Sequence, residues 1–77
     1  MKQILFYTSD GAFFGSCMAD RVCYKNNSFL FTCDETEHFT EVKGWLLGYI
    51  EVIDNEPEFS RTRYDDEKIM EYNEVIL

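Results

Sequence analysis

The sequence lacks the long apolar runs and the glycine-rich loops that mark membrane proteins and nucleotide-binding proteins. In its central part the longest stretch without a charge is residues 44–50, which is far too short to span a bilayer. Its four glycines fit neither G-x-G-x-x-G nor G-x4-G-K, so no phosphate-binding loop is predicted. We therefore expect neither a membrane span nor a nucleotide site.

Residues for metal binding or nucleophilic catalysis are scarce as well. The chain has one histidine, His38, and three cysteines, Cys17, Cys23 and Cys33. The spacing C-x5-C-x9-C-x4-H lacks the closely paired cysteines of zinc modules, and cysteine is among the most buried residue types. Core thiols are favoured over a small zinc or thiol protein. With one histidine and no orienting third group, we expect no enzyme and no cofactor.

The cysteines also bear on the cellular compartment. Their number is odd, and no secretory signal precedes them, since residues 1–3 lead into only four apolar residues, 4–7. Reduced thiols in the cytoplasm are the expected state. The length of 77 residues predicts a single domain, 1–77, with a marginal core.

Basic residues are few, and the excess of acid is unevenly spread. Fifteen acidic residues against seven basic ones give a net charge of −8. Residues 34–77 hold thirteen of the acids and only four bases, a net charge of −9. Such a charge repels nucleic acid and attracts basic protein surfaces. The basic cluster Arg61-Thr62-Arg63 is itself flanked by acids, which favours pairing within the chain.

Alternation of apolar and polar residues predicts three strands in the first half, at about 3–9, 12–24 and 28–33. Asp10-Gly11 is typical of a type I′ hairpin turn, and Asn26-Asn27 indicates a second tight turn. The polar residues 19–21 predict a bulge within the second strand. Short turns between consecutive strands predict an antiparallel meander.

The second half has helical spacing, and the expected fold is therefore α+β. A helix over about 35–54, capped by Asp34, would present one apolar face: Phe39, Val42, Leu46, Tyr49, Ile50 and Ile53. Gly44 and Gly48 oppose it, because each costs about 0.8–1 kcal/mol in a helix interior. A competing interpretation ends the helix near 44–48 and pairs residues 49–54 with 58–64 as a hairpin. A short C-terminal helix is expected at about 65–76.

An acidic surface with aromatic residues is the candidate site. The expected partner-binding residues are Glu51, Asp54, Glu56, Glu58, Tyr64, Asp65, Asp66, Glu67, Glu71, Tyr72 and Glu74. Carboxylates spaced along a small domain imitate a row of phosphates, and aromatic residues are typical interface anchors.

In size, charge and strand–helix layout the whole chain resembles small acidic inhibitors encoded by bacteriophages, a group that includes anti-CRISPR proteins and DNA mimics; no family motif matches. The resemblance implies a non-enzymatic, anti-CRISPR-like inhibitor in the host cytoplasm. Such a protein would cover a basic, nucleic-acid-binding site on a host protein complex.

A structural or assembly module is the alternative. Gly44 and Gly48 lie four residues apart, so on a helix a second backbone could approach them closely, next to Trp45. This pattern predicts a homodimer through Gly44, Trp45 and Gly48, or a subunit of a larger complex.

Overall fold

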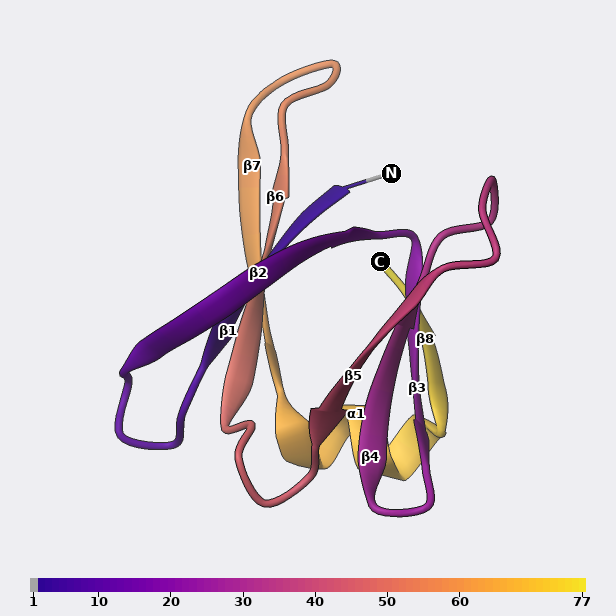
Figure 1. Ribbon diagram of the computed structural model, residues 1–77. Helices are drawn as coiled ribbons and strands as arrows, with labels where there is room; N and C mark the ends of the chain where they lie inside the picture. Colours follow the sequence, from indigo (N-terminus) through magenta and orange to yellow (C-terminus); the bar gives the residue numbers. More distant parts are fainter. Residues whose placement is uncertain (1) are drawn as a thin grey trace.

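The computed structural model describes residues 2–77, and these residues are mostly β-strand (Figure 1). Their elements, in chain order, are β1 (Lys2–Tyr7), β2 (Phe13–Ala19), β3 (Arg21–Lys25), β4 (Ser28–Thr32), β5 (Phe39–Lys43), β6 (Tyr49–Asp54), β7 (Ser60–Asp65), α1 (Asp66–Tyr72) and β8 (Glu74–Ile76). The strands form two four-stranded antiparallel sheets, ordered β2-β1-β6-β7 and β5-β4-β3-β8. The expected α+β fold with two helices is therefore wrong.

The three strands expected in the first half form at nearly the expected places, but they do not make one meander. Residues 12–24 divide at Asp20, so that β2 pairs with β1 while β3 pairs with β4. The Asp20 amide donates to the Thr32 carbonyl at 2.8 Å, and the Asp20 carbonyl accepts from the Leu77 amide at 2.9 Å. The predicted bulge is thus the corner at which the chain passes from one sheet to the other.

Both predicted turns of the first half exist, with one difference in type. Asn26 and Asn27 have φ values of 52° and 61°, the two positive values that a type I′ turn requires. In the first turn the Gly11 amide donates to the Thr8 carbonyl at 3.0 Å, and only Gly11, at φ 90°, is left-handed. The turn therefore centres on Ser9 and Asp10 and is not the type I′ turn predicted at Asp10-Gly11.

The central helix expected over 35–54 does not form. Its place is taken by β5, a turn over residues 44–46 and β6. β5 pairs with β4 and β6 pairs with β1, so each segment gains a ladder of backbone hydrogen bonds from a distant part of the chain. The helix of the competing interpretation is also absent, but its hairpin is confirmed: β6 pairs with β7 from Tyr49↔Asp65 to Asp54↔Ser60.

The C-terminal helix is shorter than the expected 65–76. α1 ends at Tyr72, because Asn73 adopts φ 64° and its amide donates to the Ile69 carbonyl at 3.0 Å. Residues 74–76 then form β8, which pairs with β3. The helix lies at one end of the two sheets, and the tip of the β6–β7 hairpin lies at the other (Figure 1).

The core lies between the sheets and is closed at one end by α1. Phe6 of β1 and Phe31 of β4 meet across it, with ring centroids 4.9 Å apart. Ile69 of α1 is fully buried against the same cluster. The buried apolar side chains are Ile4, Phe6, Ala19, Val22, Phe29, Phe31, Val42, Leu47, Ile50, Val52, Ile69 and Leu77. The core is therefore drawn from both halves of the chain.

Candidate protein-binding surface

The eleven residues predicted to bind a partner do not form one continuous patch. Asp54, Glu56 and Glu58 lie at the tip of the β6–β7 hairpin, whereas Asp65, Asp66, Glu67, Glu71 and Tyr72 lie at the end of β7 and on α1. The tip and the helix occupy opposite ends of the molecule (Figure 1). The remaining three are placed elsewhere: Glu51 on β6, Tyr64 half-buried against the core, and Glu74 on β8.

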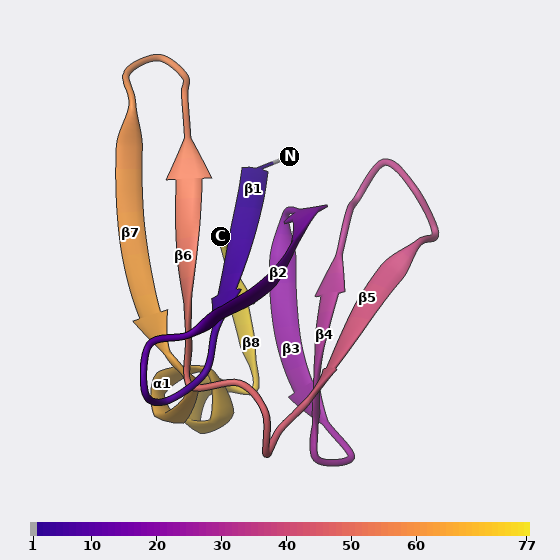
Figure 2. The same cartoon turned by 60° about the vertical axis from the view of Figure 1, so that its left-hand side comes forward.

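Strand β7 connects the two acidic ends. It begins at Ser60, just after the hairpin tip, and runs directly into α1 at Asp66. Six residues of extended chain span about 20 Å. Figure 2 shows β7 at the margin of the molecule, with the hairpin tip at one end and α1 at the other. We define the β7 surface as Glu56, Glu58, Phe59, strand β7, Asp66 and Glu67.

Apart from Asp65, which pairs with Arg63, the carboxylates of this surface take part in no ion pair within the described residues. Most cations are held by acids of the sheets and loops: Lys2–Asp54, Arg21–Asp34, Arg21–Glu74, Lys43–Glu41, Arg61–Glu51 and Arg63–Asp65. Within residues 2–77, no ion pair involves Glu56, Glu58, Asp66 or Glu67. These four carboxylates are therefore available to an external cation.

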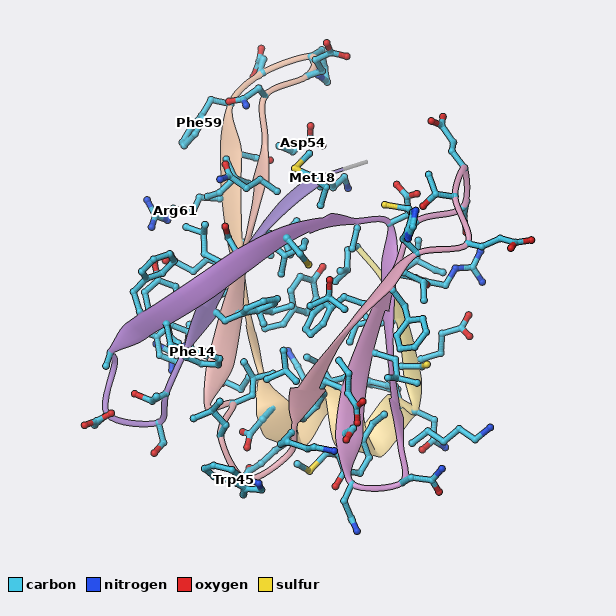
Figure 3. The ribbon with its side chains drawn as sticks, in the orientation of Figure 1. Phe14, Met18, Trp45, Asp54, Phe59 and Arg61 are labelled. Atoms are coloured by element: carbon cyan, nitrogen blue, oxygen red, sulfur yellow. The ribbon has the colours of Figure 1, made fainter. Side chains whose placement is uncertain are left out.

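An exposed aromatic side chain accompanies the acids at the hairpin tip. Phe59 is 66% exposed, and Figure 3 shows it pointing away from the sheets on the same side of the hairpin as Arg61. Tyr64, which the sequence suggested as an anchor, packs against the core instead. Tyr72 is 63% exposed, but it lies at the last position of α1. The exposed aromatic side chain of the β7 surface is thus Phe59, which the sequence did not single out.

The outer face of the β2-β1-β6-β7 sheet carries a network of aromatic rings and arginines. The rings of Tyr7 and Tyr49 stack, with centroids 4.7 Å apart and planes 8° from parallel. Phe13 meets Tyr7 edge-on at 5.8 Å, and the Arg63 guanidinium lies 3.8 Å from the Tyr49 ring centroid. Cross-strand aromatic pairs and cation–π contacts of this kind stabilise a sheet and fix its side chains.

A bidentate ion pair lies at the centre of this face. Arg61 Nε and Nη2 donate to the two carboxylate oxygens of Glu51 at 2.6 and 2.7 Å, and Nη2 also donates to the Tyr7 hydroxyl at 3.3 Å. These bonds from Arg61, and a further one from Tyr7, lower the pKa of Glu51 to about 2. Glu51, which was predicted to bind a partner, is therefore paired within the chain. For Arg61, pairing with an acid of the same chain was the prediction.

An open pocket of about 530 Å³ lies beside the tip of the β6–β7 hairpin. Its lining is Lys2, Gln3, Met18, Ile53, Asp54, Asn55 and Glu56. Lys2 Nζ and the Asp54 carboxylate lie 3.6 Å apart in an ion pair. Among these lining residues there is no cysteine, serine or histidine, so the pocket brings together no nucleophile and base.

Gly44 and Gly48 allow close approach within the chain itself. A Cβ at Gly48 would lie 2.3 Å from the Ser9 backbone, and one at Gly44 would lie 2.8 Å from the Asn27 carbonyl oxygen. Both glycines thus contact other loops of the same molecule, and the helical surface on which the dimer prediction relied does not exist. Trp45, between them, is 84% exposed and stays available to a partner (Figure 3).

The cysteines and His38 are not gathered into a metal site. No group of three or more histidine, cysteine, aspartate or glutamate side chains within the described part of the chain is arranged to hold a metal ion. Burial raises the pKa of the Cys17 thiol to about 11, so this group is protonated at neutral pH. Cys33 Sγ donates to the Met18 carbonyl at 3.2 Å.

No protein-family model, curated protein or solved structure matches this chain. The helix found within residues 2–77 falls well short of the length and apolar character needed to cross a bilayer.

Proposed function

We propose that this chain is a non-enzymatic binding protein whose β7 surface docks on a basic surface of another protein. The partner's surface is one that otherwise binds nucleic acid, so that occupation by this chain blocks it. This is the action of an anti-CRISPR-like inhibitor or DNA mimic, the group of proteins that the sequence resembles. The observation that carries the proposal is the set of unpaired carboxylates at both ends of β7.

Two features of the β7 surface support this function. The four unpaired carboxylates lie in two groups beyond the two ends of β7, at least about 20 Å apart along an extended strand, a spacing that matches several consecutive phosphates of a nucleic acid. Phe59 adds an exposed aromatic side chain, and a few such anchors supply most of the binding energy in protein interfaces.

Retention of proteins from a cell lysate on the immobilised chain tests the proposal. The retained proteins are expected to be basic and nucleic-acid-binding, to elute between about 0.1 and 1 M salt because charge pairs are screened, and to be displaced by added DNA or RNA.

A matched pair of variants locates the binding surface. The double variant Glu58→Gln/Glu67→Gln removes one charge from each end of β7. The control Glu35→Gln/Glu37→Gln removes the same charge from the loop between β4 and β5. The first variant should bind about fivefold more weakly than the wild type, and the control should bind equally well. Equal loss in both, or retention that is unchanged by salt and by nucleic acid, contradicts the proposal.

The exposure of Trp45 favours a second candidate, a self-associating structural module. A tryptophan that is 84% exposed is unusual, and tryptophan is enriched among interface anchors. Sedimentation of the wild type and of Trp45→Ser over a range of concentrations tests this candidate. A dimer that Trp45→Ser abolishes supports the module, whereas a monomer at every concentration removes it.

A further inference from the structure

We infer that the β7 edge receives an extended segment of the partner as an added strand, and that this segment carries lysine or arginine at both ends and none in its middle. The inference rests on the proposed function, because it uses the same surface. It goes further by specifying how the partner binds and what sequence it presents.

β7 has an open edge. Within the described residues, β7 pairs only with β6, and it is the last strand of its sheet. All six of its residues pair in unbroken register, without a bulge. Five of its six side chains are exposed, and no element lies outside it in Figure 2. A straight, unprotected edge of this length is a template for another strand.

The outward backbone groups of β7 can be assigned from the ladder. The Asp66 amide donates to the Gly48 carbonyl at 3.1 Å, in the same register as Asp65↔Tyr49 and Tyr64↔Ile50. Because antiparallel strands alternate, residues 60, 62 and 64 direct their N–H and C=O groups toward β6. Arg61 and Arg63 therefore direct both groups toward the open edge, and Asp65 directs only its N–H there, because the carbonyl of this N-cap residue accepts the first hydrogen bond of α1.

The three other sheet edges are poorer templates. β8 has three residues, and β2 has a register shift opposite Phe6 and Tyr7. β5 has five residues, one fewer than β7. The cations of both edges are paired, Arg61 with Glu51 and Arg63 with Asp65 on β7 and Lys43 with Glu41 on β5, so none is free to repel an added strand.

Charge selects a basic partner over a second copy of this chain. If two copies paired antiparallel through β7, the acidic hairpin tip of one would lie beside the acidic start of α1 of the other. Glu56 and Glu58 would then face Asp66 and Glu67 at both ends of the pair, and like charges in such positions repel. A segment with cations at both ends meets carboxylates instead.

The middle of the added strand is specified by the arginines of β7. Arg61 and Arg63 lie on the outer face of the sheet, where Arg63 stacks on Tyr49. Both arginines already use the nearby carboxylates, so a cation beside them would find no free carboxylate, whereas β-branched or aromatic side chains would extend the existing network. The segment is therefore basic at its ends and uncharged between them.

Two synthetic peptides with the same charge test strand addition. The first is Lys-Lys-Val-Thr-Val-Thr-Val-Lys-Lys, and the second has N-methyl groups on alternate residues of its pairing edge. The unmodified peptide should bind at low salt and the methylated one at least about tenfold more weakly, because each methyl group removes a backbone hydrogen bond to the β7 edge. Exchange of the Arg61, Arg63 and Asp65 amides should slow on binding, while that of Lys25 should not change.

Each other outcome overturns the inference in a distinguishable way. Equal binding of both peptides, with unchanged amides in β7, indicates recognition by charge alone and leaves the proposed function intact. If the unmodified peptide binds Glu58→Gln/Glu67→Gln as well as it binds the wild type, the claim that the segment needs cations at its ends is contradicted. Protection of the β7 amides that rises with protein concentration, without peptide, identifies a second copy as the occupant. Failure of both peptides, while basic proteins are retained from the lysate, contradicts strand addition only.

Discussion

At Gly48 the missing side chain decides how two distant segments meet. The Gly48 amide donates to the Tyr7 carbonyl at 2.8 Å, and its carbonyl accepts from Asp66. The backbone of Thr8 and Ser9 occupies the space where a Cβ would stand. The sequence marked this glycine as anomalous in a helix, but only the paired segments explain it.

Gly48→Ala should lower the free energy of unfolding by about 3 kcal/mol, because the overlap is with backbone that cannot rotate away. Gly15→Ala is the control, since its Cβ would make an ordinary 3.4 Å contact with the Phe6 ring, and its effect should stay within about 1 kcal/mol. Urea denaturation measures both. Equal losses in the two variants contradict the close approach at Gly48.

Glu51 makes the stability of the fold depend on acid. Arg61 and Tyr7 hold the Glu51 pKa at about 2 in the folded chain, below its ordinary value of 4.5. The unfolded chain therefore takes up the proton first, so the contribution of Glu51 is fully present above pH 4.5 and is lost as the pH falls toward 2.

The difference in unfolding free energy between the wild type and Glu51→Gln should accordingly be constant above about pH 5 and shrink between pH 4.5 and 2. Urea denaturation over a pH series measures it. Glu58→Gln is the control, because Glu58 has no ion pair within residues 2–77, and its difference should show no such step. A constant difference for Glu51→Gln down to pH 2 contradicts the assigned pair.

Among the elements, the strands of the first half could be predicted and the central helix could not. The alternation of apolar and polar residues over 3–9 and 28–33 is a local signal, and the turn residues between the strands agree with it. In residues 39–53 two alternating strands are joined by a turn, and their apolar residues fall by coincidence at helical spacing. Gly44 and Gly48 were the local signs of the break, but pairing of β6 with β1, over forty residues away, cannot be read from spacing.

The short helix α1 depends on the core rather than on its own sequence. Glu67 and Glu71 repel each other at i,i+4, no basic residue lies in the last turn, and Ile69 is its one fully buried side chain. Helices this short are not stable alone in water.

Ile69→Ala should therefore lower the unfolding free energy by about 3 kcal/mol, through lost burial and the cavity that remains. Tyr72→Ala, on the exposed end of the same helix, should change it by no more than about 0.5 kcal/mol. Thermal or urea denaturation followed by far-UV circular dichroism checks both. A small effect at Ile69 contradicts the position of α1 against the core.

At the scale of the whole molecule, the neutral and acidic halves of the sequence are not separate bodies. β6 and β7 join β1 and β2 in one sheet, and β8 joins β3 in the other. The excess charge could be predicted from composition, because counting does not depend on the fold. The location of this charge could not be predicted, because the pairing of Arg61 with Glu51 and of Arg63 with Asp65 depends on strand register. This pairing leaves the unpaired acids at the two ends of β7.

Site-specific photo-cross-linking tests the central claim, docking through the β7 surface, most directly. A photoreactive amino acid is placed at Glu58, at Glu67 or at Lys25, which lies at the end of β3 beside the β3–β4 turn. Cross-links to the same basic, nucleic-acid-binding protein are expected from positions 58 and 67 and not from position 25. Cross-links from position 25 with none from 58 or 67 would contradict the claim.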